Sequence, residues 1–297
     1  MGHERRRRAD RLVWGYFVTA RSRILAAALA VFALAVGVLI GSGLLSNGLF
    51  SGSSQADELN RARADAAAAA DEAQQGHDFA DAAGPVAVRA QLQGHSVALV
   101  RTAKTTDDDL AAAAARLEAA GAAITATVAI TDVWTDETRG PFRDALAEQI
   151  TSTLPSPPEG DTTSQVLSAA LAAALASGGE FDAAGQQSAD TLWSLLQGSG
   201  LITGERSSTA DMFLLVAHGG DVADLAGAFV ASSVGTVVGF TGGERGEAAT
   251  ATTVTNADTF YGAWAVTAAA IQTIDGISGD YDASDADELI ADLSGTS

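Results

Sequence analysis

The sequence contains no cysteine among its 297 residues. This absence excludes disulfide bonds, thiolate catalysis, cysteine-based zinc sites, iron–sulfur clusters and a lipid-modified cysteine anchor. Lys and Arg are also few, 17 against 37 Asp and Glu, which gives a formal net charge of −20. Because nucleic acids are bound through basic surfaces, we expect no nucleic-acid partner.

The few basic residues are concentrated at the amino terminus. Residues 1–23 hold seven Arg and two acidic residues, whereas the rest of the chain has a net charge of −25. Residues 24–56 carry no charge, and 24–45 form an apolar stretch that would span about 33 Å as a helix, enough to cross a bilayer. Since Arg-rich flanks stay in the cytoplasm, we predict a cytoplasmic tail at 1–23, a transmembrane helix at 24–45 and an extracytoplasmic location for the rest.

A cleaved signal peptide is the alternative interpretation of this apolar stretch. Its apolar core would be shorter, and a cleavage site of small residues would follow closely. Residues 54–56 resemble such a site weakly, but they lie far downstream of the apolar stretch. We therefore expect an uncleaved anchor, which makes this a single-pass protein of the cell membrane.

Small residues recur on one face of the predicted membrane helix. Ala33, Gly37 and Gly41 follow one another at a spacing of four residues. Such a face allows two membrane helices to approach closely. A homodimer through this face is one interpretation, although Ala and Gly are common in membrane helices generally.

A second small-residue pattern follows the membrane helix, in the linker and stalk that we place at 46–85. Residues 54–57 resemble a capping box that opens a helix, and Gly76 is a plausible end to that helix. Between them, spacings of three and four residues define a coiled-coil seam of Leu59, Ala62, Ala66, Ala69 and Ala73. We predict that this seam continues the dimer, and a solvated stalk helix without a partner is the alternative.

Residues 92–279 alternate between strand-like and helix-like patterns. Apolar runs predict strands at 96–100, 122–130, 212–217 and 236–240. Helical patterns lie between them, and they predict helices at 107–120, 141–150, 162–177, 188–197, 221–231 and 256–274. Since strands joined through helices run parallel, we predict an α/β domain with a mainly parallel sheet covered by helices on both faces. An acidic tail would follow at 280–297.

Candidate metal ligands are few and scattered. The four histidines, His3, His77, His95 and His218, form no recognisable cluster. Asp107–Asp109 could be a metal site, but three carboxylates at the start of a helix also complement its dipole. We expect no metal site and no cofactor.

The best candidate for a functional site follows the predicted strand at 212–217. His218, Gly219, Gly220 and Asp221 lead from the strand end through a Gly-Gly turn into a helix. In open α/β sheets, ligands bind at the carboxyl ends of the strands, so His218 would face the crevice there. An ordinary turn, with glycines that serve the backbone, is the alternative. The sequence has no P-loop, nucleophile-elbow or HExxH motif, and we expect no enzymatic activity.

Several stretches resemble the actinobacterial MctB/SteB family. They are the apolar segment 30–43, residues 99–102 with 119–122, and the stretch 253–262 with 279–281. The long Arg-rich head departs from the usual short amino terminus of that family. The resemblance implies two functions. One is copper transport or homeostasis, and the other is cell separation, in which SteB members act with a cytoplasmic partner, SteA, to control peptidoglycan hydrolysis.

The residues favour the second of these functions. Copper(I) prefers thiolate and thioether ligands, and copper(II) prefers clustered imidazoles, whereas this chain has no cysteine and a single internal methionine, Met212. We therefore expect a non-enzymatic, dimeric scaffold or signal coupler that links a SteA-like cytoplasmic partner at 1–23 to a cell-wall hydrolase outside. Copper transport of the MctB type is the alternative, and a hydrolase or ligand sensor that uses His218 is a third possibility.

Overall fold

The computed structural model describes residues 55–154, 162–176, 183–220, 222–233, 235–242, 245–248 and 250–283. The predicted cytoplasmic tail, the membrane helix with its face of Ala33, Gly37 and Gly41, and the last 14 residues lie outside these ranges. Of the helices in the described ranges, none combines the length and the apolar character needed to cross a membrane. The chain divides into two units, one that contains the stalk and one at Val88–Asp285.

The stalk is a single helix, α2 (Gln55–Val88), of 34 residues. At 1.5 Å per residue, such a helix is about 51 Å long. The prediction that it ends at Gly76 is wrong, because the helix continues through Gly76 and Pro85 to Val88. A glycine costs a helix only about 1 kcal/mol relative to alanine, and the alanine-rich sequence on both sides favours continuation.

The second unit is built on a seven-stranded sheet with the order β3-β2-β1-β4-β5-β6-β7. Its strands are β1 (Ser96–Arg101), β2 (Ala123–Ile130), β3 (Ile202–Arg206), β4 (Met212–Ala217), β5 (Gly235–Phe240), β6 (Thr252–Thr255) and β7 (Asp280–Asp282). All neighbouring strands are parallel except β2 and β3, which are antiparallel. The prediction of a mainly parallel sheet is confirmed.

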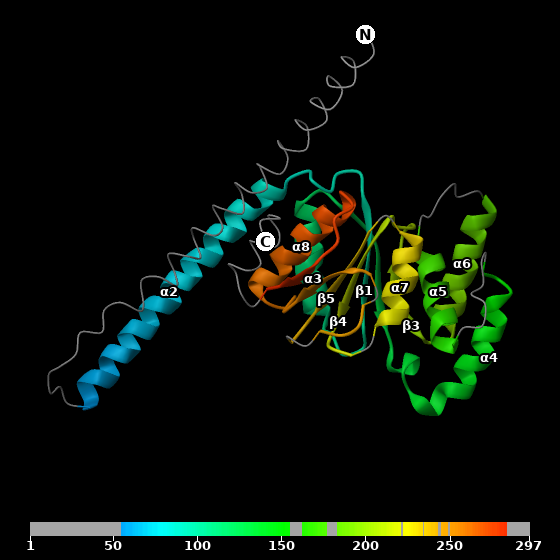
Figure 1. Ribbon diagram of the computed structural model, residues 1–297, viewed down its shortest axis with the longest axis horizontal. Coiled ribbons are helices and arrows are strands. Elements are labelled where there is room, and N and C mark those ends of the chain that lie inside the picture. The colour runs from blue at the N-terminus through cyan, green and yellow to red at the C-terminus, as the bar shows by residue number, and fades with distance from the viewer. Residues whose placement is uncertain are drawn as a thin grey trace, which may run out of the picture. The chain divides into compact units, whose positions relative to one another are not determined.

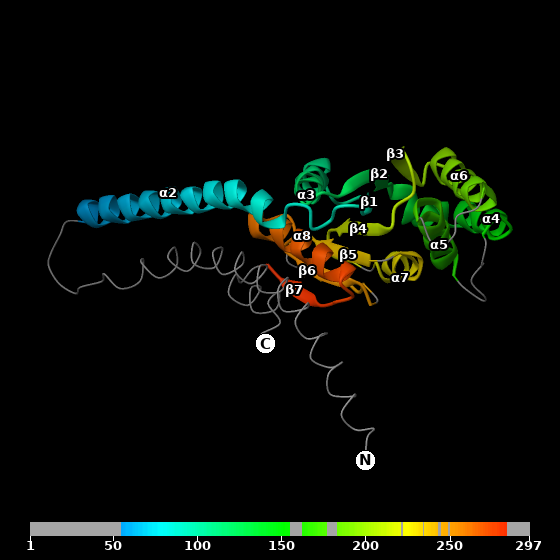
Figure 2. The ribbon, with the colours of Figure 1, turned by 90° about the horizontal axis from the view of Figure 1, so that it is seen from above.

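Helices cover both faces of this sheet, as predicted. Figure 1 shows α3 and α8 on one side of the strands and α4, α5, α6 and α7 on the other, and Figure 2 shows the same layers from above. Their bounds are α3 (Asp107–Ala119), α4 (Gly140–Thr151), α5 (Thr163–Leu175), α6 (Ala183–Gly198), α7 (Ala223–Ser232) and α8 (Phe260–Ile274). Two 3-10 turns, η1 (Asp132–Trp134) and η2 (Glu137–Arg139), precede α4.

The central strands are buried on both faces, and this explains their continuous apolar sequence. Every residue of β4 and β5 is buried. The face toward α5 and α7 belongs to the main hydrophobic core, in which the ring of Phe213 in β4 stacks on that of Phe229 in α7, with centroids 4.4 Å apart. Burial of each such ring contributes about 1.5–3 kcal/mol.

Three strands were not predicted, and all three lie toward the edges of the sheet. β3 is exposed over most of its length, and β6 is a four-residue run of mainly threonine, so neither has an apolar pattern. The helix predicted to begin at residue 256 begins at Phe260, because Asn256 adopts a positive φ of 54° and Thr259 caps α8.

β7 extends the sheet beyond residue 279, where we placed the end of the domain. Its two aspartates are held by threonine hydroxyls of β6: Thr253 Oγ1 lies 2.7 Å from Asp280 Oδ1, and Thr255 Oγ1 lies 2.8 Å from Asp282 Oδ1. Tyr281 between them is buried. The acidic residues at 280–282 therefore belong to the sheet. Backbone pairing with β6 and hydrogen bonds from threonine hydroxyls hold this strand in place, and it needs no apolar pattern of the kind seen in an inner strand.

Candidate functional site

The predicted site lies where the chain changes direction across the sheet. β1 and β4 are parallel neighbours, but β1 leads into α3 on one face and β4 leads toward α7 on the other. In open α/β sheets this switch point, at the carboxyl ends of the strands, is the usual place for a ligand. We call the described parts of the loops that follow these strands, residues 102–106 and 218–220, the carboxyl-edge site.

His218, Gly219 and Gly220 lie in this site, and Asp221 is outside the described residues. His218 is exposed, and its Nδ1 atom lies 3.0 Å from Thr241 Oγ1, the first residue after β5. Its ring also lies against Gly242, where a Cβ atom would come within 2.7 Å of His218 Cε1. The imidazole is therefore positioned by the neighbouring loop, with Nε2 as the ring nitrogen left to meet a ligand.

The glycines of the turn have a backbone role. Gly219 and Gly220 adopt positive φ values of 57° and 79°, which side-chain-bearing residues rarely do. A Cβ atom on Gly246 would collide with the carbonyl oxygen of Gly220, so the two loops pass each other closely. The interpretation of Gly219–Gly220 as a structural turn thus has a direct geometric basis, and it is compatible with a site at His218.

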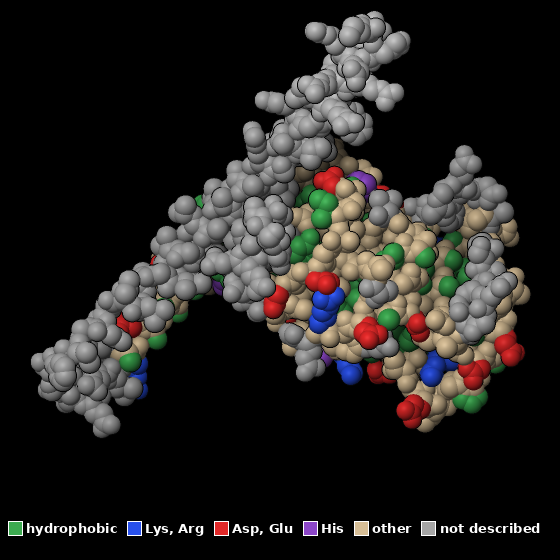
Figure 3. Space-filling model, in the orientation of Figure 1, with side chains coloured by type: hydrophobic (Ala, Val, Ile, Leu, Met, Phe, Trp, Pro, Cys, Tyr) green, Lys and Arg blue, Asp and Glu red, His purple; other side chains and the backbone are tan. Residues whose placement is uncertain are grey.

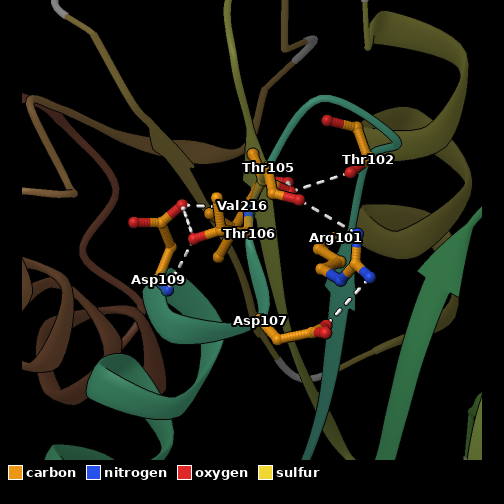
Figure 4. Close-up of polar contacts among 7 residues, drawn as sticks. All are labelled: Arg101, Thr102, Thr105, Thr106, Asp107, Asp109 and Val216. Atoms are coloured by element: carbon orange, nitrogen blue, oxygen red, sulfur yellow. Dashed lines mark hydrogen bonds and ion pairs between the residues drawn. The ribbon is translucent and has the colours of Figure 1, made fainter.

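Arg101, at the carboxyl end of β1, is a second functional candidate in the same region, and it was not among the residues predicted for the site. Its Nη1 atom donates to the carbonyl oxygen of Thr105 at 3.0 Å, and its Nη2 atom lies 2.8 Å from Asp107 Oδ1 (Figure 4). Its side chain is only 19% exposed. In the sequence, Arg101 could have been recognised as a single arginine at the end of an apolar strand.

The loop after β1 is tied to β4 by further hydrogen bonds. Thr102 donates its backbone N–H to Val216 O at 3.0 Å, and the buried Thr105 donates its hydroxyl to Thr102 O at 2.8 Å (Figure 4). The first of these bonds holds Thr102 beside Val216 of β4, which lies two residues before His218. The site is consequently formed by residues that are more than 100 positions apart in the sequence.

Asp107–Asp109 serve the start of α3, as the dipole interpretation predicted. Thr106 and Asp109 form a capping box, in which Thr106 Oγ1 accepts from Asp109 N and Asp109 Oδ2 accepts from Thr106 N (Figure 4). Asp107 pairs with Arg101 instead. These contacts engage two of the three carboxylates, those of Asp107 and Asp109, at the start of α3.

The carboxyl-edge site includes basic side chains on an acidic protein. Arg101 ends β1, Lys104 lies in the loop that follows it, and His218 lies in the loop after β4. Lys104 is the only lysine of the sequence. Over the face shown in Figure 3, acidic side chains are more prominent than basic ones. Arg101 is already paired with Asp107, so the exposed Lys104 is the cationic group best placed to attract an anionic group.

The candidate copper ligands in the described residues come from different elements of the chain. His77 is in α2, His95 lies 2.8 Å from Asp211 at the amino edge of the sheet, and His218 is at the carboxyl edge. Met212 is buried in β4. Within the part of the chain that the structure describes, no three His, Cys, Asp or Glu side chains gather as a metal site.

The predicted stalk seam belongs to α2. Ala62, Ala66 and Ala69 are exposed and Ala73 is half-buried, and the side chain of Leu59 is outside the described residues. Gly76 occupies the next seam position, three residues after Ala73. The pattern of small residues therefore runs further along α2 than predicted.

The family model described as "Copper transport outer membrane protein, MctB" matches residues 18–290 of the chain. The match includes the predicted membrane helix, α2 and the whole α/β domain. No curated protein matches the chain.

Proposed function

The chain belongs to the MctB family, an envelope family associated with copper transport. We propose that it is a non-enzymatic scaffold protein of the cell envelope. In this proposal, residues 24–45 anchor it in the cell membrane, α2 pairs with α2 of a second copy, and the α/β domain lies outside. The family description names an outer membrane protein. A cell-membrane anchor is supported by the 22-residue apolar stretch that follows seven arginines.

The observation that carries the proposal is that residues 62–71 of α2 are exposed. All ten residues from 62 to 71 are exposed in the single chain, so this part of the helix gains no packing within the described residues. Most helices in proteins depend on packing of one face for their stability. A second copy supplies such packing along the seam of Ala62, Ala66 and Ala69, and Gly76 extends the surface of close approach.

The coupling role rests on the distribution of charge along the chain. The arginines at 1–23 and the acidic remainder would lie on opposite sides of the membrane. A basic tail of this kind can bind an acidic cytoplasmic protein, and we propose a SteA-like partner there. The carboxyl-edge site would then contact a cell-wall hydrolase or its regulator outside.

Copper transport is the second candidate function, and the family description favours it. The donor set argues against a copper carrier, because copper selects thiolate, thioether or clustered imidazole ligands. The three described histidines belong to three separate regions, and Met212 is 1% exposed. A role in copper handling would then be indirect, through a partner that binds the metal.

A deletion strain complemented with the full chain distinguishes the two functions. We expect deletion to cause incomplete cell separation and to leave growth in copper-supplemented medium at the parental level. Complementation with a chain that lacks residues 4–11 should fail to restore separation, although the protein reaches the membrane. Copper sensitivity with normal separation would instead support the copper candidate and contradict the scaffold.

A further inference from the structure

A pocket lies at the amino edge of the sheet, opposite the carboxyl-edge site. It is formed by the first residues of β5 and β6 and by the chain around the carboxyl-terminal ends of α7 and α8, and its volume is about 180 Å³. Figure 1 shows α7 and α8 on opposite sides of β5, so the pocket receives residues from both helical layers. Pockets for drug-sized ligands are larger, about 300–1,000 Å³, so this one suits a smaller molecule.

The lining of this amino-edge pocket is rich in hydroxyl groups and uncharged. Of the eleven described residues that line it, six carry a hydroxyl, namely Ser233, Thr236, Thr250, Thr252, Thr273 and Ser278. Among the described residues that line it, none bears a charge. This composition makes a charged ligand unfavourable, because burial of a charge without a partner is costly.

The hydroxyls are arranged in linked pairs across neighbouring segments. Thr273 Oγ1 lies 3.0 Å from Thr252 Oγ1, which joins α8 to β6, and Ser233 Oγ lies 3.0 Å from Thr236 Oγ1, which joins the end of α7 to β5. A hydroxyl donates one hydrogen bond and accepts up to two. Thr273 Oγ1 and Ser233 Oγ can also donate to the helix carbonyls Ala269 O at 2.7 Å and Phe229 O at 2.8 Å. Each hydroxyl has only one proton to donate, so each linked pair keeps acceptor capacity for the hydroxyl of a ligand.

Two further features favour a ligand with several O–H groups and an apolar face. The carboxyl-terminal turns of α7 and α8 present carbonyl oxygens and a partial negative charge, which repels anions and accepts hydrogen bonds. Ile277, 53% exposed, and Val230 supply apolar surface beside the hydroxyls. A molecule that combines O–H groups with a C–H face matches both features.

We propose that the amino-edge pocket binds a neutral, polyhydroxylated small molecule of the size of one sugar ring. Its hydroxyls pair with the threonine and serine hydroxyls, and its C–H face packs against Ile277. The pocket is independent of the scaffold proposal, because it uses neither α2 nor the carboxyl-edge site.

Saturation-transfer NMR on the full chain tests this site directly. The protein is held in a detergent without a sugar headgroup, and the probes are glucose, N-acetylglucosamine and the charged sugar glucuronate. We expect transfer to at least one of the two neutral sugars and weaker transfer to glucuronate. Transfer to neither neutral sugar, or stronger transfer to glucuronate, would overturn the proposal.

Two variants and a control locate the binding. Thr252→Val removes a buried hydroxyl with little change of shape, and Ser278→Leu fills the pocket from an exposed loop, so a folding defect in the first leaves the second informative. Loss of hydrogen bonds or of space should weaken binding about tenfold or more in Ser278→Leu and about fivefold in Thr252→Val. Thr191→Val, on the exposed surface of α6, should bind as the parent does. Equal binding by all three variants would place the sugar elsewhere and refute the pocket.

Discussion

His218 Nδ1 lies 3.0 Å from Thr241 Oγ1, which connects the loop after β4 to the loop after β5. The hydrogen bond holds an exposed imidazole at the carboxyl edge of the sheet, and the same ring lies against Gly242, whose φ is +77°. The position of His218 therefore depends on a glycine 24 residues away in sequence. Mutation of His218 and of Gly242, singly and together, can therefore separate the effect of the hydrogen bond from that of the backbone conformation.

His218→Ala should leave the fold intact, with a loss of less than about 1.5 kcal/mol, because it removes one hydrogen bond from an exposed side chain. Gly242→Ala should cost more, about 1–3 kcal/mol, since alanine is strained at this φ and its Cβ atom meets the imidazole. Urea denaturation of both variants and of the double variant measures the difference. In the double variant the steric part should disappear and the strain should remain. Identical stabilities for the two single variants would contradict this geometry.

Arg101→Ala should destabilise the domain by about 1–3 kcal/mol, because a largely buried guanidinium loses its bonds to Thr105 O and Asp107. Asp107→Asn should cost less than about 1 kcal/mol, since the aspartate side chain is 87% exposed and an exposed ion pair contributes little. Denaturation curves at low and high salt provide the comparison. If Asp107→Asn cost as much as Arg101→Ala, the ion pair and not the bond to Thr105 would hold the loop.

Thr106→Ala should cost about 1 kcal/mol, because it removes the side-chain cap of α3 and leaves Asp109 N without its acceptor. Thr106→Ser keeps the hydroxyl and should remain within a few tenths of a kcal/mol of the parent. Thermal denaturation is sufficient as the measurement. An equal loss in both variants would mean that the threonine methyl group, and not the cap, is important.

The inner part of the fold could be predicted from the sequence, and the edges could not. β4 and β5 are buried on both faces, so their apolar runs show in the sequence. α3 begins with a capping box that can be read directly. β3 and β7 are edge strands with polar residues, and their pairing is set by the neighbouring strand. The helix end predicted at Gly76 was wrong because the prediction considered the glycine alone and not the helix-favouring alanines on both sides of it.

The candidate sites show the same division. His218 could be located from the sequence because it directly follows an apolar strand. The role of Arg101 could not, since its partners depend on how the loop at 102–106 folds. The amino-edge pocket draws its hydroxyls from four segments between residues 230 and 278, and no single stretch of sequence carries that pattern.

Calorimetry with copper tests the donor-set argument. The full chain has no cysteine, and its described histidines lie in separate regions. We therefore expect only weak, non-stoichiometric heat with copper(II) and with copper(I) kept reduced. A single stoichiometric site with submicromolar affinity would favour the copper candidate. His218→Ala and a variant that lacks His3 would then show which histidine contributes.

The central claim, a dimer through the exposed seam of α2, is tested most directly by crosslinking of single-cysteine variants in membranes. The native chain has no thiol, so each variant reports one position only. We predict that Ala62→Cys and Ala69→Cys, both on the seam, form interchain disulfides on mild oxidation, and that Ala64→Cys, on another face of α2, does so much less readily. Equal crosslinking at all three positions, or none at any of them, would contradict the dimeric scaffold.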